Sequence, residues 1–145
     1  MEDYDDILLP TDGSKGTERT VGHAVSLALN HDATLHVLYV VDRRRFLAAD
    51  KDTQDEVIAS LREEGQVAVD GVAVTAEEAG VEVETVMREG IPHKTIREYA
   101  ADEAVDVVAM GTHGQTGRDR VANLGSVTER VLKAVEMPVF VVNIE

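Results

Sequence analysis

Five short apolar segments recur along the chain and alternate with longer segments of helical periodicity. Short runs that are rich in Val, Ile and Leu and bounded by turn residues are typical of β-strands. The five predicted strands are 6–10 (DILLP), 34–41 (TLHVLYVV), 81–88 (VEVETVMR), 105–110 (VDVVAM) and 138–144 (PVFVVNI). The second, fourth and fifth are nearly continuous apolar runs, which is the pattern of parallel strands buried on both faces.

Helices are predicted between these strands, at 14–30, 52–79, 92–104 and 126–135. The first carries its apolar residues at positions 21, 24, 25 and 28, which lie on one side of a helix. The second contains Gly65 and Gly71, where so long a helix could bend or break. Strands that alternate with helices pair in parallel through right-handed crossovers, with helices on both faces of the sheet. We therefore expect one open α/β domain that spans residues 1–145.

The segment 42–50 (DRRRFLAAD) is the one place where an irregular insertion is expected. It lies between the second strand and the long helix, and it contains the triplet Arg43-Arg44-Arg45. Such a triplet is usually part of a solvated loop. The other interpretation is a flap that touches a bound anion.

The charge of the chain narrows the classes of partner. Fourteen basic residues, of which only four are lysine, stand against twenty-eight acidic residues, for a net charge of −14. A surface of this sign repels nucleic acid and anionic membranes, so neither is expected as a partner. The acidic excess is spread along the whole chain and resembles the surfaces of proteins from organisms that accumulate molar salt, which screens self-repulsion. An acidic protein from an ordinary bacterium is the alternative.

The absence of cysteine excludes disulfides and thiolate metal sites and favours an intracellular protein. The acidic start MEDYDD is unlike a signal peptide, and no apolar run reaches membrane-spanning length. We therefore expect a cytoplasmic location.

Two chemically unusual loops follow the first and fourth predicted strands. The first is Pro10-Thr11-Asp12-Gly13-Ser14, and the second begins at Gly111 within GTHGQTGRDRVANLGSVTERV. In open parallel sheets, ligands bind beyond the carboxyl ends of the strands, where the strand order reverses. If the first and fourth strands are neighbours, as in the order 3-2-1-4-5, both loops line one crevice.

The second loop ends in Gly125-Ser126-Val127-Thr128-Glu129, which opens the last predicted helix. A helix start favours an anion such as phosphate, because its amides are free and its dipole is positive there. Glycines at 111 and 114 would let a ligand approach the backbone, and two hydroxyls would add donors. The sequence Ser126-x-x-Glu129 is also a capping box, in which the two side chains satisfy the helix start themselves. Capping and phosphate binding can coexist, since capping uses only some of the free amides.

The remaining polar residues near these loops carry weaker signals. Asp12 could accept hydrogen bonds from a ribose, but Thr-Asp-Gly is also ordinary turn chemistry. His113 could donate to phosphate or be merely solvated, and Arg118 and Arg120 could neutralise phosphate or serve the surface. The other histidines, at 23, 31, 36 and 93, lack metal-ligand spacing, so no metal site is predicted. Neither the Walker loop nor the dinucleotide fingerprint is present, and no catalytic residue is predicted.

With these motifs identified, the chain resembles the universal stress protein family over essentially its whole length. The resemblance rests on ILLPTDGS, LHVLYVVD, MGTHGQTG and LGSVTERVLKAVEMPVFVV. It implies a Rossmann-like fold with an open five-stranded parallel sheet in the order 3-2-1-4-5, a stress-related role, and a homodimer built through the last strand, 139–143. Physical reasoning agrees on the dimer, because an apolar edge strand invites pairing or covering.

The resemblance also implies a nucleotide site. Members of this family that bind ATP carry G-x-x-G, nine residues, then G-[ST]; here residues 115–124 number ten, so the chain has one extra residue in this segment. We expect it to form a harmless bulge at the far side of the loop, because both ends of the motif are intact. By resemblance, Mg-ATP would be bound by Pro10, Thr11, Asp12 and Val40 near the adenosine, by Met110 and Gly111, and by His113, Gly114, Gly125, Ser126, Val127 and Thr128 near the phosphates.

The leading hypothesis is therefore a dimeric, ATP-binding stress sensor or regulator that hydrolyses ATP slowly at most. The alternative is a dimerisation and interaction module of the same fold that does not bind nucleotide. A phosphoacceptor signalling domain would need an aspartate at the end of the third strand, where Met87-Arg88-Glu89-Gly90 offers none.

Overall fold

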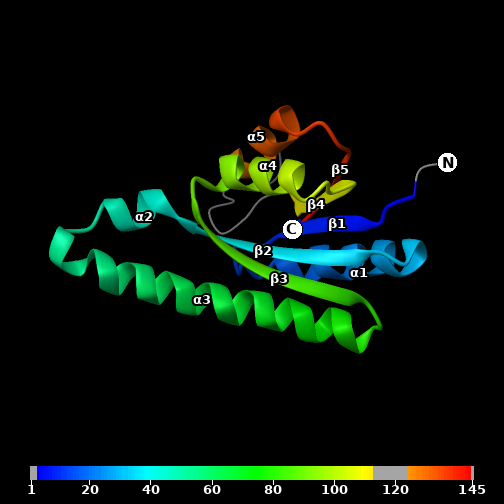
Figure 1. Cartoon of the computed structure of the whole chain (residues 1–145), viewed down its shortest axis with the longest axis horizontal. Coiled ribbons are helices and arrows are strands. Elements are labelled where there is room, and N and C mark those ends of the chain that lie inside the picture. Colours follow the sequence, from blue (N-terminus) through cyan, green and yellow to red (C-terminus); the bar gives the residue numbers. More distant parts are fainter. Residues whose placement is uncertain (1–2, 113–123, 145) are drawn as a thin grey trace.

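The computed structural model describes residues 3–112 and 124–144 of the chain (Figure 1). Its five strands form one parallel sheet in the order β3-β2-β1-β4-β5, which confirms the predicted architecture. The elements in chain order are β1 (Asp6–Pro10), α1 (Thr17–His31), β2 (Thr34–Asp42), α2 (Arg43–Leu47), α3 (Lys51–Glu78), β3 (Glu82–Gly90), α4 (Pro92–Asp102), β4 (Val107–Gly111), α5 (Ser126–Ala134) and β5 (Val139–Val142).

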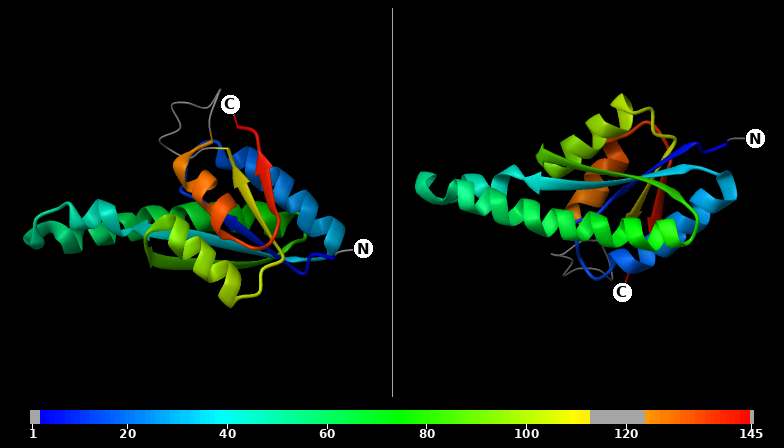
Figure 2. Two further views of the ribbon diagram at one scale, coloured as in Figure 1. Left: turned by 90° about the horizontal axis from the view of Figure 1, so that it is seen from above. Right: turned by 60° about the horizontal axis from the view of Figure 1, so that its bottom comes forward.

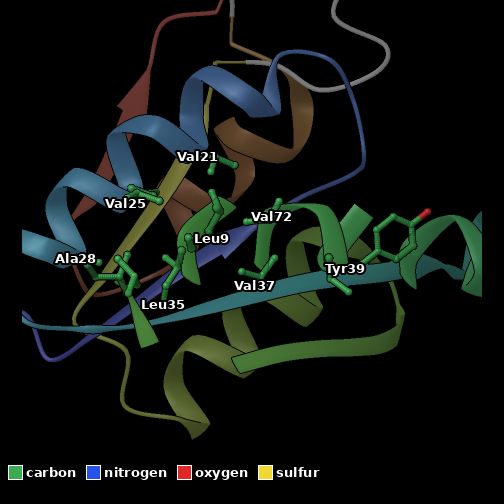
Figure 3. Packing of buried hydrophobic residues seen from close by; sticks show 14 of the residues in the cluster. Leu9, Val21, Val25, Ala28, Leu35, Val37, Tyr39 and Val72 are labelled. Carbon is green, nitrogen blue, oxygen red and sulfur yellow. The ribbon is translucent and has the colours of Figure 1, made fainter. Parts of the chain in front are cut away.

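Helices cover both faces of the sheet, with α1 and α3 on one face and α4 and α5 on the other (Figures 1 and 2). Alternation along the strands divides the core accordingly. On β1, Ile7 and Leu9 join the cluster under α1 and α3, whereas Leu8 joins the cluster under α4 and α5. Figure 3 shows Leu9 among the valines, Leu35 and Tyr39 of the first cluster. Both faces of the central strands are therefore apolar, as their continuous apolar sequences predicted.

Two local predictions are wrong. The segment 42–50 is not an irregular loop, because residues 43–47 form the short helix α2. Asp42 caps this helix by accepting a hydrogen bond from the backbone N–H of Arg44 at 3.0 Å, and its carboxylate also binds the Arg44 guanidinium at 2.8 and 3.0 Å. A helix of five residues is too short to show a periodicity in the sequence. Burial raises the pKa of Asp42, but the hydrogen bonds and charge of Arg44 outweigh burial and leave the pKa below its usual value.

The long helix α3 also continues through both glycines without a break. At Gly65 the missing side chain has a packing reason, because a Cβ there would collide with the ring of Tyr39. At Gly71 a Cβ would meet no atom within 4 Å. The sheet beneath α3 therefore keeps the helix regular despite two residues of low helix propensity.

A buried polar cluster lies on the α4 face of the sheet. His36 on β2 is 3% exposed, and its Nδ1 lies 2.7 Å from the hydroxyl of Tyr99 on α4, while its Nε2 lies 2.8 Å from Oδ1 of Asp6. Burial, together with the charges of Glu103 and Glu84, raises the pKa of Tyr99 to about 12. His36 is thus held on both ring nitrogens within the core.

Among the described helices, none combines the length and the apolar character that crossing a membrane requires.

Candidate functional site

The carboxyl ends of β1 and β4 lie next to each other, as the two-loop hypothesis requires. The strands pair directly, with Ile7 opposite Val107 and Leu8 opposite Val108. Pro10 and Gly111 are the last residues of the two strands, so both unusual loops begin at the same edge of the sheet. We refer to the space between these loops and the start of α5 as the crevice.

The β1 loop is a tight turn organised by its own side chains. Thr11 Oγ1 accepts the backbone N–H of Gly13 at 3.1 Å, and Asp12 Oδ1 accepts that of Ser14 at 3.0 Å. Gly13 has φ +79°, a conformation that favours glycine. The turn interpretation of Thr-Asp-Gly is therefore confirmed. Asp12 is exposed, whereas Thr11 is buried, with its N–H bonded to the carbonyl of Leu38 on β2 at 2.9 Å.

The start of α5 differs from the capping box that the sequence suggested. Gly125 occupies the N-cap position, no side chain caps the helix, and Ser126 is already its first residue. A capping box needs the hydroxyl residue at the N-cap itself, one position earlier. The capping interpretation of Ser126 and Glu129 is therefore wrong, and no side chain among the described residues caps the start of α5.

Hydrogen bonds tie this helix start to the end of β4. The N–H of Gly125 donates to the carbonyl of Thr112 at 2.6 Å, and Thr128 Oγ1 donates to the carbonyl of Gly111 at 2.9 Å. Thr128 is 4% exposed, so its hydroxyl is buried and serves the contact between α5 and β4, whereas Ser126 is exposed. The predicted phosphate-side residues therefore divide, with Thr128 positioning the helix and Ser126 facing outward.

Apolar residues lie on the side of this region that faces α4 and α5. Val40, near the carboxyl end of β2, is only half-buried although it lies on an interior strand. Val40 and Val127 both pack against the cluster that contains Met110, which is buried. A partly exposed aliphatic surface beside polar backbone is the composition expected of a small-molecule site.

Four predicted features lie outside the described residues. They are His113, Gly114, the pair Arg118 and Arg120, and the extra residue of the glycine motif. In the part of the chain that the structure does describe, no three or more His, Asp or Glu side chains are grouped so that they could hold a metal ion.

Basic side chains that the sequence analysis did not connect gather near α4 and α5. Burial lowers the pKa of His93, and so do the charges of Arg130, Lys94, Arg44 and Arg97. These residues come from α2, α4 and α5. The register of the sheet brings the starts of α2 and α4 near each other, because Asp42 pairs with Gly90 and the two helices begin soon after these positions. Basic side chains near one another in so acidic a chain would favour an anion, although Arg44 is already paired with Asp42.

Comparisons with known proteins agree on one family. Residues 3–143 match the model of the universal stress protein family. Universal stress protein MJ0531 of Methanocaldococcus jannaschii is 42% identical over 140 residues, which cover 96% of this chain and 82% of that protein. The solved structure of MJ0577 from the same organism has a TM-score of 0.86 at 34% identity and covers 96% of this chain and 95% of its own. UspA from Lactobacillus plantarum has a TM-score of 0.82 at 30% identity, with 98% and 99% covered.

More distant universal stress proteins share the fold. One was solved in complex with cAMP at 18% identity and a TM-score of 0.73, and one from Archaeoglobus fulgidus with dAMP at 19% and 0.70. One from Arabidopsis thaliana was solved with AMP bound, at 17% and 0.70. The match to the family model over nearly the whole chain, supported by the close relatives, means that this chain belongs to the universal stress protein family.

Proposed function

We propose that this protein binds ATP, with its Mg²⁺, in the crevice and acts as a cytoplasmic stress sensor or regulator with slow hydrolysis at most. The observation that carries the proposal is the start of α5. It is a helix N-terminus without a side-chain cap, and hydrogen bonds hold it against the end of β4. Free backbone donors and the positive end of a helix dipole favour phosphate. Relatives of the same fold, solved with cAMP, dAMP and AMP, support an adenine nucleotide as the ligand class.

The residues on the crevice divide by chemistry. We assign the phosphates to the backbone of residues 125–127, with the exposed hydroxyl of Ser126 as an added donor, and Thr128 holds this segment in place. We assign the adenosine to the β1 loop, Pro10 to Asp12, and to the apolar surface of Val40 beside Met110. Gly111 would join the binding through its main chain. His113 and Gly114 are proposed on the phosphate side from the sequence motif alone.

Two features of the site fit a Mg-nucleotide: an exposed carboxylate for the metal's water shell, and basic side chains for the phosphates. Mg²⁺ usually keeps several waters and is bound through the phosphates and at most one or two carboxylates. The exposed carboxylate of Asp12 lies in the β1 loop, where it could face such a water shell. The basic residues near His93 would offset the repulsion that a chain of −14 exerts on a polyanion.

Ser126→Asp tests the proposal without endangering the fold. An aspartate in the first turn of α5 stabilises the helix through the dipole, yet it places a negative charge where the phosphates would bind. We expect titration calorimetry with Mg-ATP in high salt to give a binding isotherm for the wild type and none for Ser126→Asp. Ser126→Ala, which removes the hydroxyl but adds no charge, is the matched control and should bind only a few-fold more weakly. No heat from the wild type at millimolar Mg-ATP refutes the proposal.

The alternative function, an interaction module without nucleotide, is favoured by the outer edge of the sheet. Phe140 on the edge strand β5 is 42% exposed, and its ring centroid lies 6.1 Å from that of His23 on α1. We propose that residues 139–143 pair with a second copy to form a homodimer. A dimer that carries no nucleotide after purification, and whose melting temperature ATP leaves unchanged, would favour this alternative.

A further inference from the structure

Ile144, which follows β5, lies against the start of α1 and the end of β4. It is 6% exposed although it belongs to no helix or strand. Its side chain lies directly against the backbone of Gly16, where an added Cβ would be 2.5 Å from Ile144 Cγ2. It also lies against Gly111, where an added Cβ would collide with its Cδ1. The segment after β5 runs beside the start of α1 (Figure 2).

Backbone hydrogen bonds hold Ile144 in this place. Its N–H donates to Thr112 Oγ1 at 3.2 Å, and the N–H of Thr112 donates to the carbonyl of Val142 at 2.9 Å. Thr112 is therefore bonded both to the end of β5, at Val142, and to the segment after it, at Ile144. The aliphatic side chain also contacts Gly16, which is the N-cap of α1 and lies two residues after the β1 loop.

This contact gives a second reason why position 111 is a glycine. A side chain at Gly111 would meet Ile144 on one side and the buried hydroxyl of Thr20 on another, at 3.1 Å. The side on which Gly111 lacks a Cβ therefore faces protein. Because Gly16 and Gly111 have no side chain, one isoleucine packs against both the start of α1 and the end of β4.

We propose that Ile144 is a positioning residue for the crevice, acting through Gly16 and Gly111 to hold the start of α1 and the end of β4 at the separation that nucleotide binding needs. This inference rests on the proposed function. Truncation of the side chain leaves a cavity between these two segments, and segments lined by glycine can relax into it. Because the donors on the two loops must act on one ligand, a small shift between them weakens binding.

The test compares Ile144→Ala with Ile144→Val, and uses Val105→Ala as the control. Val105 is buried and precedes β4, at the opposite end of that strand from Gly111, so its truncation destabilises the core away from the crevice. We expect Ile144→Ala to raise the Kd for Mg-ATP by about tenfold, a loss of roughly 1.4 kcal/mol in binding. Ile144→Val, which keeps both branches at Cβ, should restore most of the affinity. Val105→Ala should lower the melting temperature and leave the Kd unchanged.

Hydrogen exchange of the protein without nucleotide separates this inference from the proposed function. We expect Ile144→Ala to speed exchange at the Thr112 amide and in the β1 loop, whereas Val105→Ala should not. The variant Gly111→Ala should be destabilised in the wild-type background, but it should cost much less stability when added to Ile144→Ala, because the truncation removes the main collision and leaves only the tight contact with Thr20. Equal Kd values for Ile144→Ala and wild type, or equal losses for Ile144→Ala and Val105→Ala, overturn the inference. If the wild type binds no nucleotide, the proposed function fails, and the exchange and double-variant results still decide whether Ile144 positions the loops.

Discussion

The hydroxyl of Tyr99 should stabilise the fold by a measurable amount, and Tyr99→Phe removes it alone. The hydroxyl lies 2.7 Å from Nδ1 of His36, in a cluster where both residues are at most 5% exposed. We assign the His36 proton to Nε2, since this atom lies 2.8 Å from the carboxylate of Asp6, so that Nδ1 accepts from Tyr99. In Tyr99→Phe, Nδ1 keeps only Glu84 nearby, with Oε2 at 3.4 Å, and a carboxylate can donate no hydrogen bond to it.

The size of the loss follows from burial. A buried acceptor that loses its donor costs about 1–3 kcal/mol, which corresponds to roughly 3–10 °C in melting temperature for a chain of this size. We therefore expect Tyr99→Phe to lower the free energy of unfolding by about 2 kcal/mol. Urea unfolding at one fixed salt concentration measures this. Tyr4→Phe is the matched control, because the hydroxyl of Tyr4 has no hydrogen-bond partner within the described part of the chain and should contribute little.

The same hydroxyl predicts an alkaline pH dependence. The pKa of Tyr99 is about 12 in the folded protein and about 10 in an unfolded chain, so between these values the folded state holds a proton that the unfolded state releases. The contribution of this hydroxyl to the free energy of unfolding is fully present below pH 10. It decreases as the pH rises toward 12, by up to about 3 kcal/mol. Tyr99→Phe should flatten this decline. A loss below about 0.5 kcal/mol, the scale of ordinary surface substitutions, together with an unchanged alkaline decline, would refute the reasoning.

Other contacts predict further outcomes. Gly65→Ala should destabilise the protein by about 1–3 kcal/mol in thermal unfolding, because the new methyl collides with the buried ring of Tyr39; Gly71→Ala, on the open side of the same helix, should instead stabilise it by up to about 1 kcal/mol, and a gain at both positions would contradict the collision. Thr128→Val keeps the side-chain shape but removes the hydrogen bond from α5 to the end of β4, so we expect a loss of about 1–2 kcal/mol in urea unfolding and weaker binding of Mg-ATP in calorimetry. Phe140→Glu places a charge on the edge strand β5 and should convert the proposed dimer to a monomer in light scattering; a variant that remains dimeric would place the interface elsewhere.

Local sequence patterns determined most of the architecture. The continuous apolar runs at 34–41 and 105–110 identified strands buried on both faces, and their alternation with helical segments required a parallel sheet. Because parallel strands end at one edge, the pattern of strands placed both unusual loops at the same edge of the sheet, but their adjacency depended on the strand order. Family resemblance supplied the strand order and the expectation of a nucleotide.

Only the tertiary structure decided the contacts on which the site depends. Ser126 and Glu129 have the spacing of a capping box, but the N-cap is Gly125, which is bonded to Thr112, so Ser126 falls inside the helix. The sequence shows that position 111 has no side chain. It does not show that the side chain of Ile144, 33 positions later, occupies the space beside it. Periodicity and capping rules describe interactions within a few residues, whereas these contacts join segments that meet only when the sheet assembles and the core packs.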